Sequence, residues 1–487
     1  MAAPAHPPLG YARRTPEQTV LYEALRRHSE TFLADLDADP ASSGLPAFVR
    51  GEIERFLKCG ILAHGFVRVY CPTCKDDLLV GFSCKGRGLC PSCGARRMAD
   101  TARRWVEGLL PHVPYRQWVL TLPFPLRFRL AWDHELLGRV LDLFQRAVGM
   151  RLRSRARARG HAGGRHAAVT VVQRFGSSLN LNVHFHSLVA EGVWVEGEDG
   201  PRFVGVKVGP EDVEWVVRRV HRMVSRLLGR EGLLDEDVED GVEADVEHPL
   251  QLQVAAASVL GRTALGPRAG RPVRAVGRRG RREPQTRAQK RSRRRRMQSA
   301  VGGFDLQAGV RIPARHRHRL EHLARYILRP AISSDRLKVL PDGSFMYELR
   351  RPWADGTTGF LFDPHELLEK LVALVPIPRG NLVRYHGLFA PRAGDRAAVV
   401  LAGSGGTSST TKHSEEVPAR LAWADLLRRV FLIDVLCCTR CGGRRRVLDA
   451  VTDAGAAARI LVHLGLDAEA PRAVPARAPP DHYDIAS

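Results

Sequence analysis

The sequence predicts an α+β fold in which helices pack on an antiparallel sheet. Residues 180–189 alternate between polar and apolar side chains, which is typical of a strand with one buried face. Residues 133–148 and 216–229 instead carry apolar residues at helical spacing. Because the elements follow the order strand, helix, strand, strand, helix, with one hairpin in the middle, we expect an antiparallel sheet covered by helices.

The chain is expected to begin with helices. Pro16 opens a helical region that extends to about residue 58, and a cysteine-rich segment follows at 59–97. The first strand is expected at 117–122, because an apolar run there is ended by Pro123.

The central part of the chain then supplies the remaining elements. Asp133 is expected to cap the first long helix, because its carboxylate can accept hydrogen bonds from the first turn. A strand at 167–174 precedes the alternating strand, and Gly229 is expected to end the second long helix.

Composition favours a nucleic-acid partner. The 487 residues include 75 Lys or Arg and 52 Asp or Glu, so the net charge is 75 − 52 = +23. An excess of this sign attracts polyanions, above all the phosphate backbone of nucleic acids. Residues 268–296 carry fourteen of the basic residues and one acid, and so charged a segment is expected to form a loop or arm rather than part of a core.

Two further segments have the composition of linkers, namely the Gly/Ser/Thr-rich 402–417 and the Ala/Pro-rich tail 471–487. No apolar stretch is long enough to cross a membrane, and the first residues lack the apolar core of a secretory signal. We therefore expect the protein to remain in the cytoplasm, with no membrane partner.

The nine cysteines are clustered in a way that favours metal binding over disulfides. Two CxxC pairs with fifteen residues between them fit one tetrahedral structural Zn²⁺ site, and the pairs are Cys71 with Cys74 and Cys90 with Cys93. Cys59 and Cys84 are left over, either as buried thiols or as part of a second metal site. The pair Cys438 and Cys441 forms half of a similar site that would need ligands from elsewhere, with Cys437 and His463 as candidates.

The alternating strand predicts a second kind of metal site. His184 and His186 lie on its polar face with Asn180 and Asn182, while Phe185 points to the opposite face. Neutral imidazoles suit Mn²⁺ or a transition metal, and Gln173 on the preceding strand could reach the same region. The alternative interpretation is a pair of histidines on a solvated strand face.

A predicted helix at 315–330 offers a nucleophile, Tyr326. His322 lies four residues earlier and so shares its face, and Arg325 and Arg329 flank the tyrosine with charges that can hold phosphates. A phenol ionises near pH 10 and must be activated by a metal-polarised phosphate or a nearby cation. The alternative is that Tyr326 is an ordinary residue of an amphipathic helix.

These residues resemble rolling-circle insertion-sequence transposases of the HUH type, in particular the common-region branch with one tyrosine. The segments that carry the resemblance are Phe82–Cys93, Gln173–His186, Arg325–Pro330 and Arg384–Pro391. The resemblance implies an HUH endonuclease core in which His184, Phe185 and His186 match the histidine motif. Tyr326 matches the second of the two tyrosines that two-tyrosine members carry, and His322 stands at the first position. A single-tyrosine enzyme must release or recycle one DNA end, or use Tyr385 or a second subunit.

The resemblance also implies the domain organisation and the activity. Zinc-binding residues 1–105 would precede an endonuclease domain at 106–345 with an Arg-rich loop at 262–300. A C-terminal region at 346–470 and a disordered tail at 471–487 would follow. The expected function is cleavage and rejoining of single-stranded DNA at element ends through a 5′-phosphotyrosine, with structural Zn²⁺ and catalytic Mg²⁺ or Mn²⁺, in the nucleoid of a bacterium. A homo-oligomer is left open.

Two other functions compete with this one. A zinc-containing DNA-binding protein without catalysis would account for the cysteines and the charge, but not for a histidine face beside a tyrosine. A type IA topoisomerase-like enzyme would also combine a tyrosine with zinc sites, but it would need an acidic metal cluster in place of the imidazoles.

Overall fold

The computed structural model describes residues 15–38, 44–233, 249–277, 297–401, 424, 427–428 and 434–477. Residues 278–296 of the Arg-rich loop, the whole 402–417 linker and the last ten residues of the expected tail lie outside these ranges. None of the helices within them is long and apolar enough to cross a membrane.

The core is an antiparallel sheet with the strand order β15-β4-β5-β3-β10-β9, and β11 also pairs with β3. Its strands are β3 (Tyr115–Thr121), β4 (Ala167–Phe175), β5 (Leu181–Ala190), β9 (Gln298–Val301), β10 (Phe304–Gln307), β11 (Arg311–Ile312) and β15 (Val383–Gly387). All of its pairings are antiparallel, which confirms the predicted α+β class.

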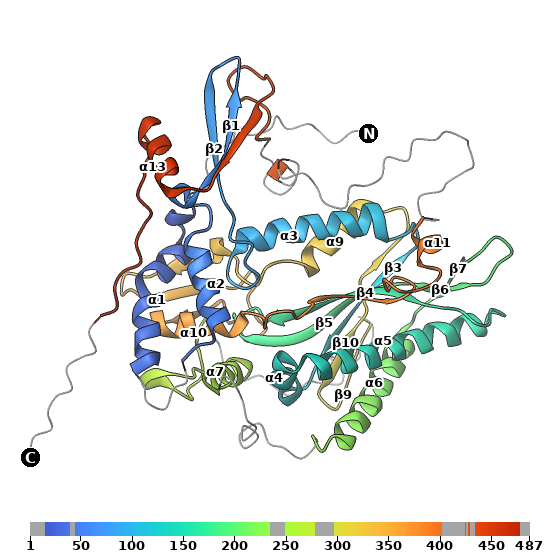
Figure 1. Cartoon of the computed structure of the whole chain (residues 1–487). Helices are drawn as coiled ribbons and strands as arrows, with labels where there is room; N and C mark the ends of the chain where they lie inside the picture. Colours follow the sequence, from blue (N-terminus) through green and yellow to red (C-terminus); the bar gives the residue numbers. More distant parts are fainter. Residues whose placement is uncertain are drawn as a thin grey trace, which may run out of the picture.

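Helices cover both faces of this sheet (Figure 1). One face carries α4 (Phe124–Trp132), α5 (His134–Arg157), α6 (Pro210–Arg230) and α7 (Pro249–Val259), and the other carries α3 (Pro91–Arg104) and α9 (Arg317–Ile327). The alternation of β5 divides its side chains between two cores. Val183 and Phe185 pack with the helix α5 residue Phe144, whereas Leu188 packs with Leu320 of α9.

Smaller elements surround this core. The N-terminal part contains η1 (Pro16–Gln18), α1 (Val20–Ala38), α2 (Ala47–Leu57), η2 (Leu62–His64) and the π-helical turn η3 (Trp105–Leu109). A four-stranded sheet, ordered β12-β13-β14-β8, comprises β8 (Arg274–Val276), β12 (Leu337–Val339), β13 (Phe345–Glu348) and β14 (Gly359–Phe362). The others are β6 (Gly192–Val195), β7 (Arg202–Gly205), η4 (Gly266–Arg268), η5 (Ser334–Arg336), α10 (Pro364–Leu374), α11 (Arg396–Leu401) and α13 (Ala454–His463).

A separate three-stranded sheet projects above the body of the molecule in Figure 1. It has the order β16-β1-β2 and consists of β1 (Phe66–Cys71), β2 (Asp76–Gly81) and β16 (Arg446–Val451). The expected C-terminal region 346–470 contributes strands to two other sheets. It adds β15 to the central sheet and β16 to the N-terminal hairpin, because each of these strands pairs its backbone along an otherwise open edge.

Capping and turn residues in the sequence predicted where several of these helices and strands begin or end, to within one or two residues. Asp133 accepts a hydrogen bond from the backbone nitrogen of Leu136 at 2.8 Å and caps α5 as predicted. The expected strand at 117–122 begins two residues earlier, and the second long helix ends at Arg230 rather than at Gly229.

Replacing Phe144 by alanine is predicted to destabilise the central sheet by about 3–5 kcal/mol, because the buried ring stacks on Phe185 at 6.4 Å between centroids and its removal leaves a cavity. Chemical denaturation followed by tryptophan fluorescence measures the change. The matched control is Val462→Ala on α13, where the side chain is 68% exposed and a change of about 0.5 kcal/mol or less is expected. Equal effects of the two substitutions would contradict the assignment of the core.

Candidate active site and metal centres

Strand β5 holds His184 and His186 on the sheet face that α9 covers. Phe185, between them, is fully buried on the other face, so neither histidine can turn away without moving a core residue. The two imidazole rings lie 4.9 Å apart between centroids, at an angle of 62°. The strand pairing places Gln173 of β4 opposite His184.

The His184 ring is held as a neutral base. Burial, together with the nearby Arg329 charge, lowers its pKa to about 4 against the opposing effect of its hydrogen bond to the Asn182 backbone. Nδ1 lies 2.8 Å from the carbonyl oxygen of Asn182, and because a carbonyl can only accept, the ring donates from this nitrogen. Nε2 therefore keeps its lone pair and is available to a metal ion.

His186 is also neutral, because burial, the adjacent His184 and the charge of Arg329 hold its pKa well below the usual range. Its Nδ1 lies 2.8 Å from the carboxamide of Gln117 on β3. A carboxamide can present either its oxygen or its NH₂ group, so Gln117 can orient this ring in either tautomer.

Gln117 was missed by the sequence analysis. It lies in the first predicted strand and is 5% exposed. A glutamine at the start of the predicted strand was the available signal, because an amide buried in a sheet needs a hydrogen-bond partner.

Gln173 joins the histidine strand to the tyrosine helix. The side chain is 3% exposed, and its Nε2 donates to the backbone oxygen of Ile327, at the end of α9, over 2.6 Å. This bond fixes the amide, since the reverse orientation would place two acceptors together. Its Oε1 is consequently left buried without a hydrogen-bond partner among the described residues.

Helix α9 presents Tyr326 beside the imidazoles. Its apolar side packs on the sheet through Leu320, Leu323, Ala324 and Ile327. Tyr326 is 45% exposed, and its ring lies 6.5 Å from the His186 ring between centroids, at 80°.

Arg329 covers the tyrosine. Its guanidinium carbon lies 4.4 Å from the centre of the Tyr326 ring, and its Nη1 donates to the backbone oxygen of Tyr326 at 3.1 Å. The structure thus brings His184, His186, Gln173, Tyr326 and Arg329 together.

The remaining predicted residues lie around this group. His322 is exposed one turn before Tyr326 on α9, and Arg325 is partly buried on the same helix. Tyr385 lies on β15, which β4 separates from β5, and its hydroxyl accepts a hydrogen bond from the indole nitrogen of Trp105 at 3.3 Å.

The cysteines form two groups rather than the single site predicted from the two CxxC pairs. One group is Cys59, Cys84, Cys90 and Cys93, and the other is Cys71, Cys74, Cys438 and Cys441. The predicted combination is wrong because Cys71 and Cys74 lie at the turn of the β1–β2 hairpin, while Cys90 caps the start of α3. Long-range pairing, rather than spacing in the sequence, selects the partners.

The first group fits a structural zinc ion. Four sulfurs at about 2.3 Å from a tetrahedral zinc lie about 3.8 Å from one another, whereas a disulfide would bring two sulfurs to about 2.05 Å. The Sγ–Sγ distances are 3.6 Å for Cys59 to Cys90, 3.7 Å for Cys59 to Cys93 and 3.5 Å for Cys84 to Cys93. Cys59 and Cys84, left over in the sequence analysis, thus complete a four-sulfur site.

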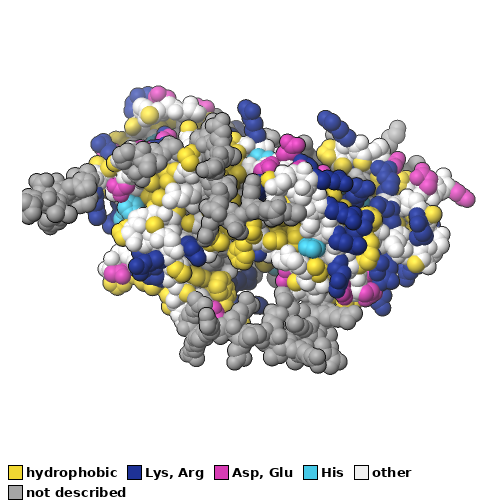
Figure 2. Space-filling view, turned by 90° about the horizontal axis from the view of Figure 1, so that it is seen from below, with side chains coloured by type: hydrophobic (Ala, Val, Ile, Leu, Met, Phe, Trp, Pro, Cys, Tyr) yellow, Lys and Arg dark blue, Asp and Glu magenta, His cyan; other side chains and the backbone are white. Residues whose placement is uncertain are grey.

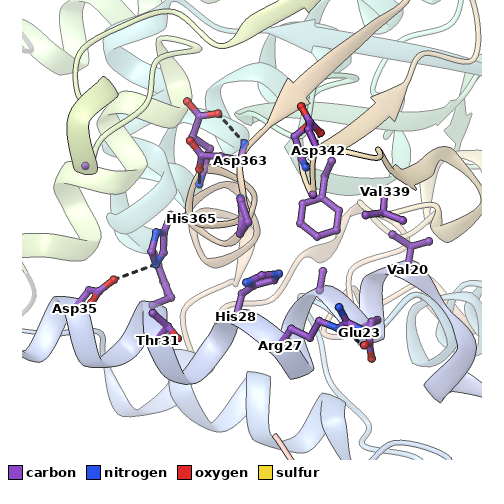
Figure 3. Close-up of a pocket in the computed structure, with 18 of the residues that line it drawn as sticks. Val20, Glu23, Arg27, His28, Thr31, Asp35, Val339, Asp342, Asp363 and His365 are labelled. Carbon is purple, nitrogen blue, oxygen red and sulfur yellow. Dashed lines mark hydrogen bonds and ion pairs between the residues drawn. The ribbon is translucent and has the colours of Figure 1, made fainter. Parts of the chain in front are cut away.

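A cavity of about 1200 Å³ lies elsewhere, between α1, the β12–β13 turn and the start of α10 (Figure 3). Several of its charged groups pair with one another. Asp35 contacts His365 at 3.1 Å, and the Glu366 carboxylate accepts from Arg268 at 2.8 Å. None of the predicted site residues lines this cavity.

Comparison with known proteins found two family matches. Residues 167–396, which include the two histidines and Tyr326, match a family described as a putative transposase. Residues 24–122 match the zinc-binding domain of IS91-type transposases. No curated protein and no solved structure matched the chain.

Replacing Cys84 by serine is predicted to remove one zinc ion per chain, because three sulfurs and a hydroxyl make a much weaker site. Cys59→Ser should have the same effect, and combining the two substitutions should remove no further ion. Zinc released from purified protein with a mercurial reagent and quantified with a colorimetric chelator gives the stoichiometry. Cys437→Ser, outside both groups, is the control. Full zinc retention in Cys84→Ser would instead support the single site predicted from the sequence, with Cys71, Cys74, Cys90 and Cys93 as ligands.

Proposed function

The chain belongs to the IS91 family of transposases, and from this premise we propose that it cleaves and rejoins single-stranded DNA at the ends of its element through a 5′-phosphotyrosine at Tyr326. A transposase acts on DNA, and the net charge of +23 suits that partner. Beyond family membership, we propose the tyrosine chemistry, the residues that carry it and the single-stranded form of the DNA substrate.

The observation that carries the proposal is the convergence of a half-exposed phenol with two neutral imidazoles. Tyr326 comes from α9 and the imidazoles from β5, and their rings lie 6.5 Å apart at His186. A structural tyrosine on an amphipathic helix would have no need of buried, uncharged histidines beside it.

The donors around the phenol fit Mg²⁺ or Mn²⁺. His184 offers Nε2, and His186 offers the nitrogen that Gln117 does not contact. Gln173 offers a buried amide oxygen without a partner among the described residues, and such an oxygen is a suitable ligand for a hard cation. When bound here, the ion would polarise the scissile phosphate and make its phosphorus a better electrophile.

The chain's own residues then position and carry out the exchange. The Tyr326 oxygen attacks phosphorus in line, its proton passes to solvent, and a bond from tyrosine oxygen to phosphorus forms as the bond to the 3′ oxygen breaks. The departing oxygen takes up a proton and leaves a free 3′-OH. Attack by another 3′-OH on the phosphotyrosine reverses these steps, so the strands rejoin without nucleotide hydrolysis.

Arginines support the DNA contacts on two faces. Arg329 lies against the Tyr326 ring, where its guanidinium can hold the phosphate that the phenol attacks. On the opposite face, Figure 2 shows Lys and Arg side chains gathered where α5 and α6 lie. Helix α6 contributes exposed arginines one turn apart, at Arg218, Arg222 and Arg226.

Having one tyrosine on α9 affects how the two DNA ends are handled. His322 stands where a second nucleophile would lie, so each chain holds one DNA end at a time on this helix. Tyr385 is a less suitable substitute, because Trp105 donates to its hydroxyl oxygen.

Tyr326→Phe is predicted to abolish covalent attachment to DNA, because phenylalanine has no oxygen to bond phosphorus. The measurement is a denaturing gel of protein incubated with a labelled single-stranded oligonucleotide from an element end and Mg²⁺ or Mn²⁺. Tyr385→Phe is the matched control and should keep the adduct. An adduct that persists in Tyr326→Phe would refute the assignment. Loss of the adduct in Tyr385→Phe alone would identify Tyr385 on β15 as the nucleophile.

Gln173→Met is predicted to slow cleavage about 10–100-fold and to raise the Mn²⁺ concentration needed for half-maximal cleavage, because methionine keeps the volume but removes the amide. Initial cleavage rates across a Mn²⁺ titration measure both effects. Gln307→Met, an exposed substitution on β10 of the same sheet, should leave both unchanged. An unchanged metal requirement in Gln173→Met would exclude Gln173 as a ligand.

A further inference from the structure

We propose that Cys71, Cys74, Cys438 and Cys441 hold a second zinc ion, which fastens the C-terminal part of the chain to the N-terminal hairpin. The first two cysteines lie within the matched zinc-binding domain, whereas the other two lie beyond both matched families. The site is therefore shared between a recognised segment and one that no match describes. It does not depend on the phosphotyrosine proposal.

The sulfur positions fit one tetrahedral ion. All four Sγ atoms lie within 4.8 Å of one another, and none of the cysteines is in a disulfide. The distance is 3.6 Å from Cys71 to Cys441 and 3.9 Å from Cys74 to Cys438, close to the edge of about 3.8 Å expected around zinc. Each of these contacts joins one CxxC pair to the other, so neither pair is complete alone.

The two CxxC turns have the same local design. Residue Lys75 follows the first pair at a φ of 53°, and Gly442 follows the second at a φ of 69°. These left-handed residues let the chain turn sharply after each pair, and each turn also directs a backbone N–H group at a cysteine sulfur. Cys74 N lies 3.5 Å from the Cys71 sulfur, and Gly443 N lies 3.4 Å from the Cys441 sulfur. Such donors stabilise thiolates, which are the form that binds zinc.

Packing alone holds β16 weakly. Of its six residues only Val451, at the end far from the cysteines, is buried, and Val447 and Leu448 are 55% and 51% exposed. The described apolar cluster beneath the sheet is small, with Phe66, Leu79 and Leu461 among its members. Small modules with little core are commonly stabilised by a metal ion.

Charge around the turns also fits a four-thiolate zinc site. Four thiolates around Zn²⁺ leave two negative charges, which nearby cations can offset. The buried Arg445 donates to the backbone oxygen of Cys437 at 3.2 Å and lies 3.4 Å from Asp76, and the exposed Arg440 lies 3.8 Å from the same carboxylate. The sheet register places these cations next to the cysteine turns.

The test is zinc stoichiometry of the full chain by native mass spectrometry. Two ions per chain are expected, one for each cysteine group. Cys438→Ser should leave one, and Cys74→Ser combined with Cys438→Ser should also leave one, because both substitutions damage the same site. Cys84→Ser combined with Cys438→Ser should leave none, and Cys437→Ser should keep both ions. Retention of two ions in Cys438→Ser, or loss of both in the Cys74/Cys438 variant, would overturn the proposal.

Hydrogen exchange keeps the test independent of global unfolding. Cys441→Ser changes an exposed residue, so the central sheet should keep its amide protection. Amides of β16 are expected to exchange at least tenfold faster in this variant than in the unmodified chain, while amides of β4 and β5 exchange at the unmodified rate. Unchanged protection of β16 would show that no metal holds the strand.

Discussion

The hydrogen bond from the Gln173 side chain to the Ile327 backbone oxygen is the contact on which the candidate active site depends. It joins β4, which lies beside the histidine strand, to the end of the helix that carries Tyr326. Because the donor is an amide NH₂ and the acceptor can only accept, the bond also determines where the amide oxygen points. One buried contact thus fixes the C-terminal end of α9 and leaves a free amide oxygen on the residue that pairs with His184.

The pleat of β5 imposes the other constraint. Phe185 must enter the core against Phe144, so its neighbours His184 and His186 must leave it on the opposite face. A shift of one residue in this strand would place the two imidazoles in the apolar core against α5 and turn Phe185 to the face that α9 covers. The same face then receives α9, whose apolar residues are buried while Tyr326 stays accessible. Hydrophobic packing of α9 therefore brings the phenol to the histidine face, and the Gln173 bond holds the end of the helix there.

The zinc-binding part is connected to this site through α3. Cys90 of the first cysteine group is the N-cap of this helix, and the helix also contacts α9. Gly94 lies so close to Pro330, the residue three positions after Ile327, that an added Cβ would come within 2.7 Å of the proline ring. A zinc ion in the first group would hold the start of α3 and, through this contact, the segment that follows the tyrosine helix. The second group lies elsewhere, in the projecting sheet where β16 pairs with the β1–β2 hairpin.

By itself the sequence determined the α+β class, the polar histidine face, the Asp133 cap and the exposed side of the tyrosine helix. Each of these follows from periodicity or capping among residues close in the chain, and such interactions depend little on distant partners. The tertiary structure alone decided which cysteines share a site, since strand pairing brings Cys441 to Cys71 across 370 residues. It also decided that Gln117 contacts His186 and that Gln173 binds Ile327, because a buried amide takes its partner from whichever strand or helix packs against it.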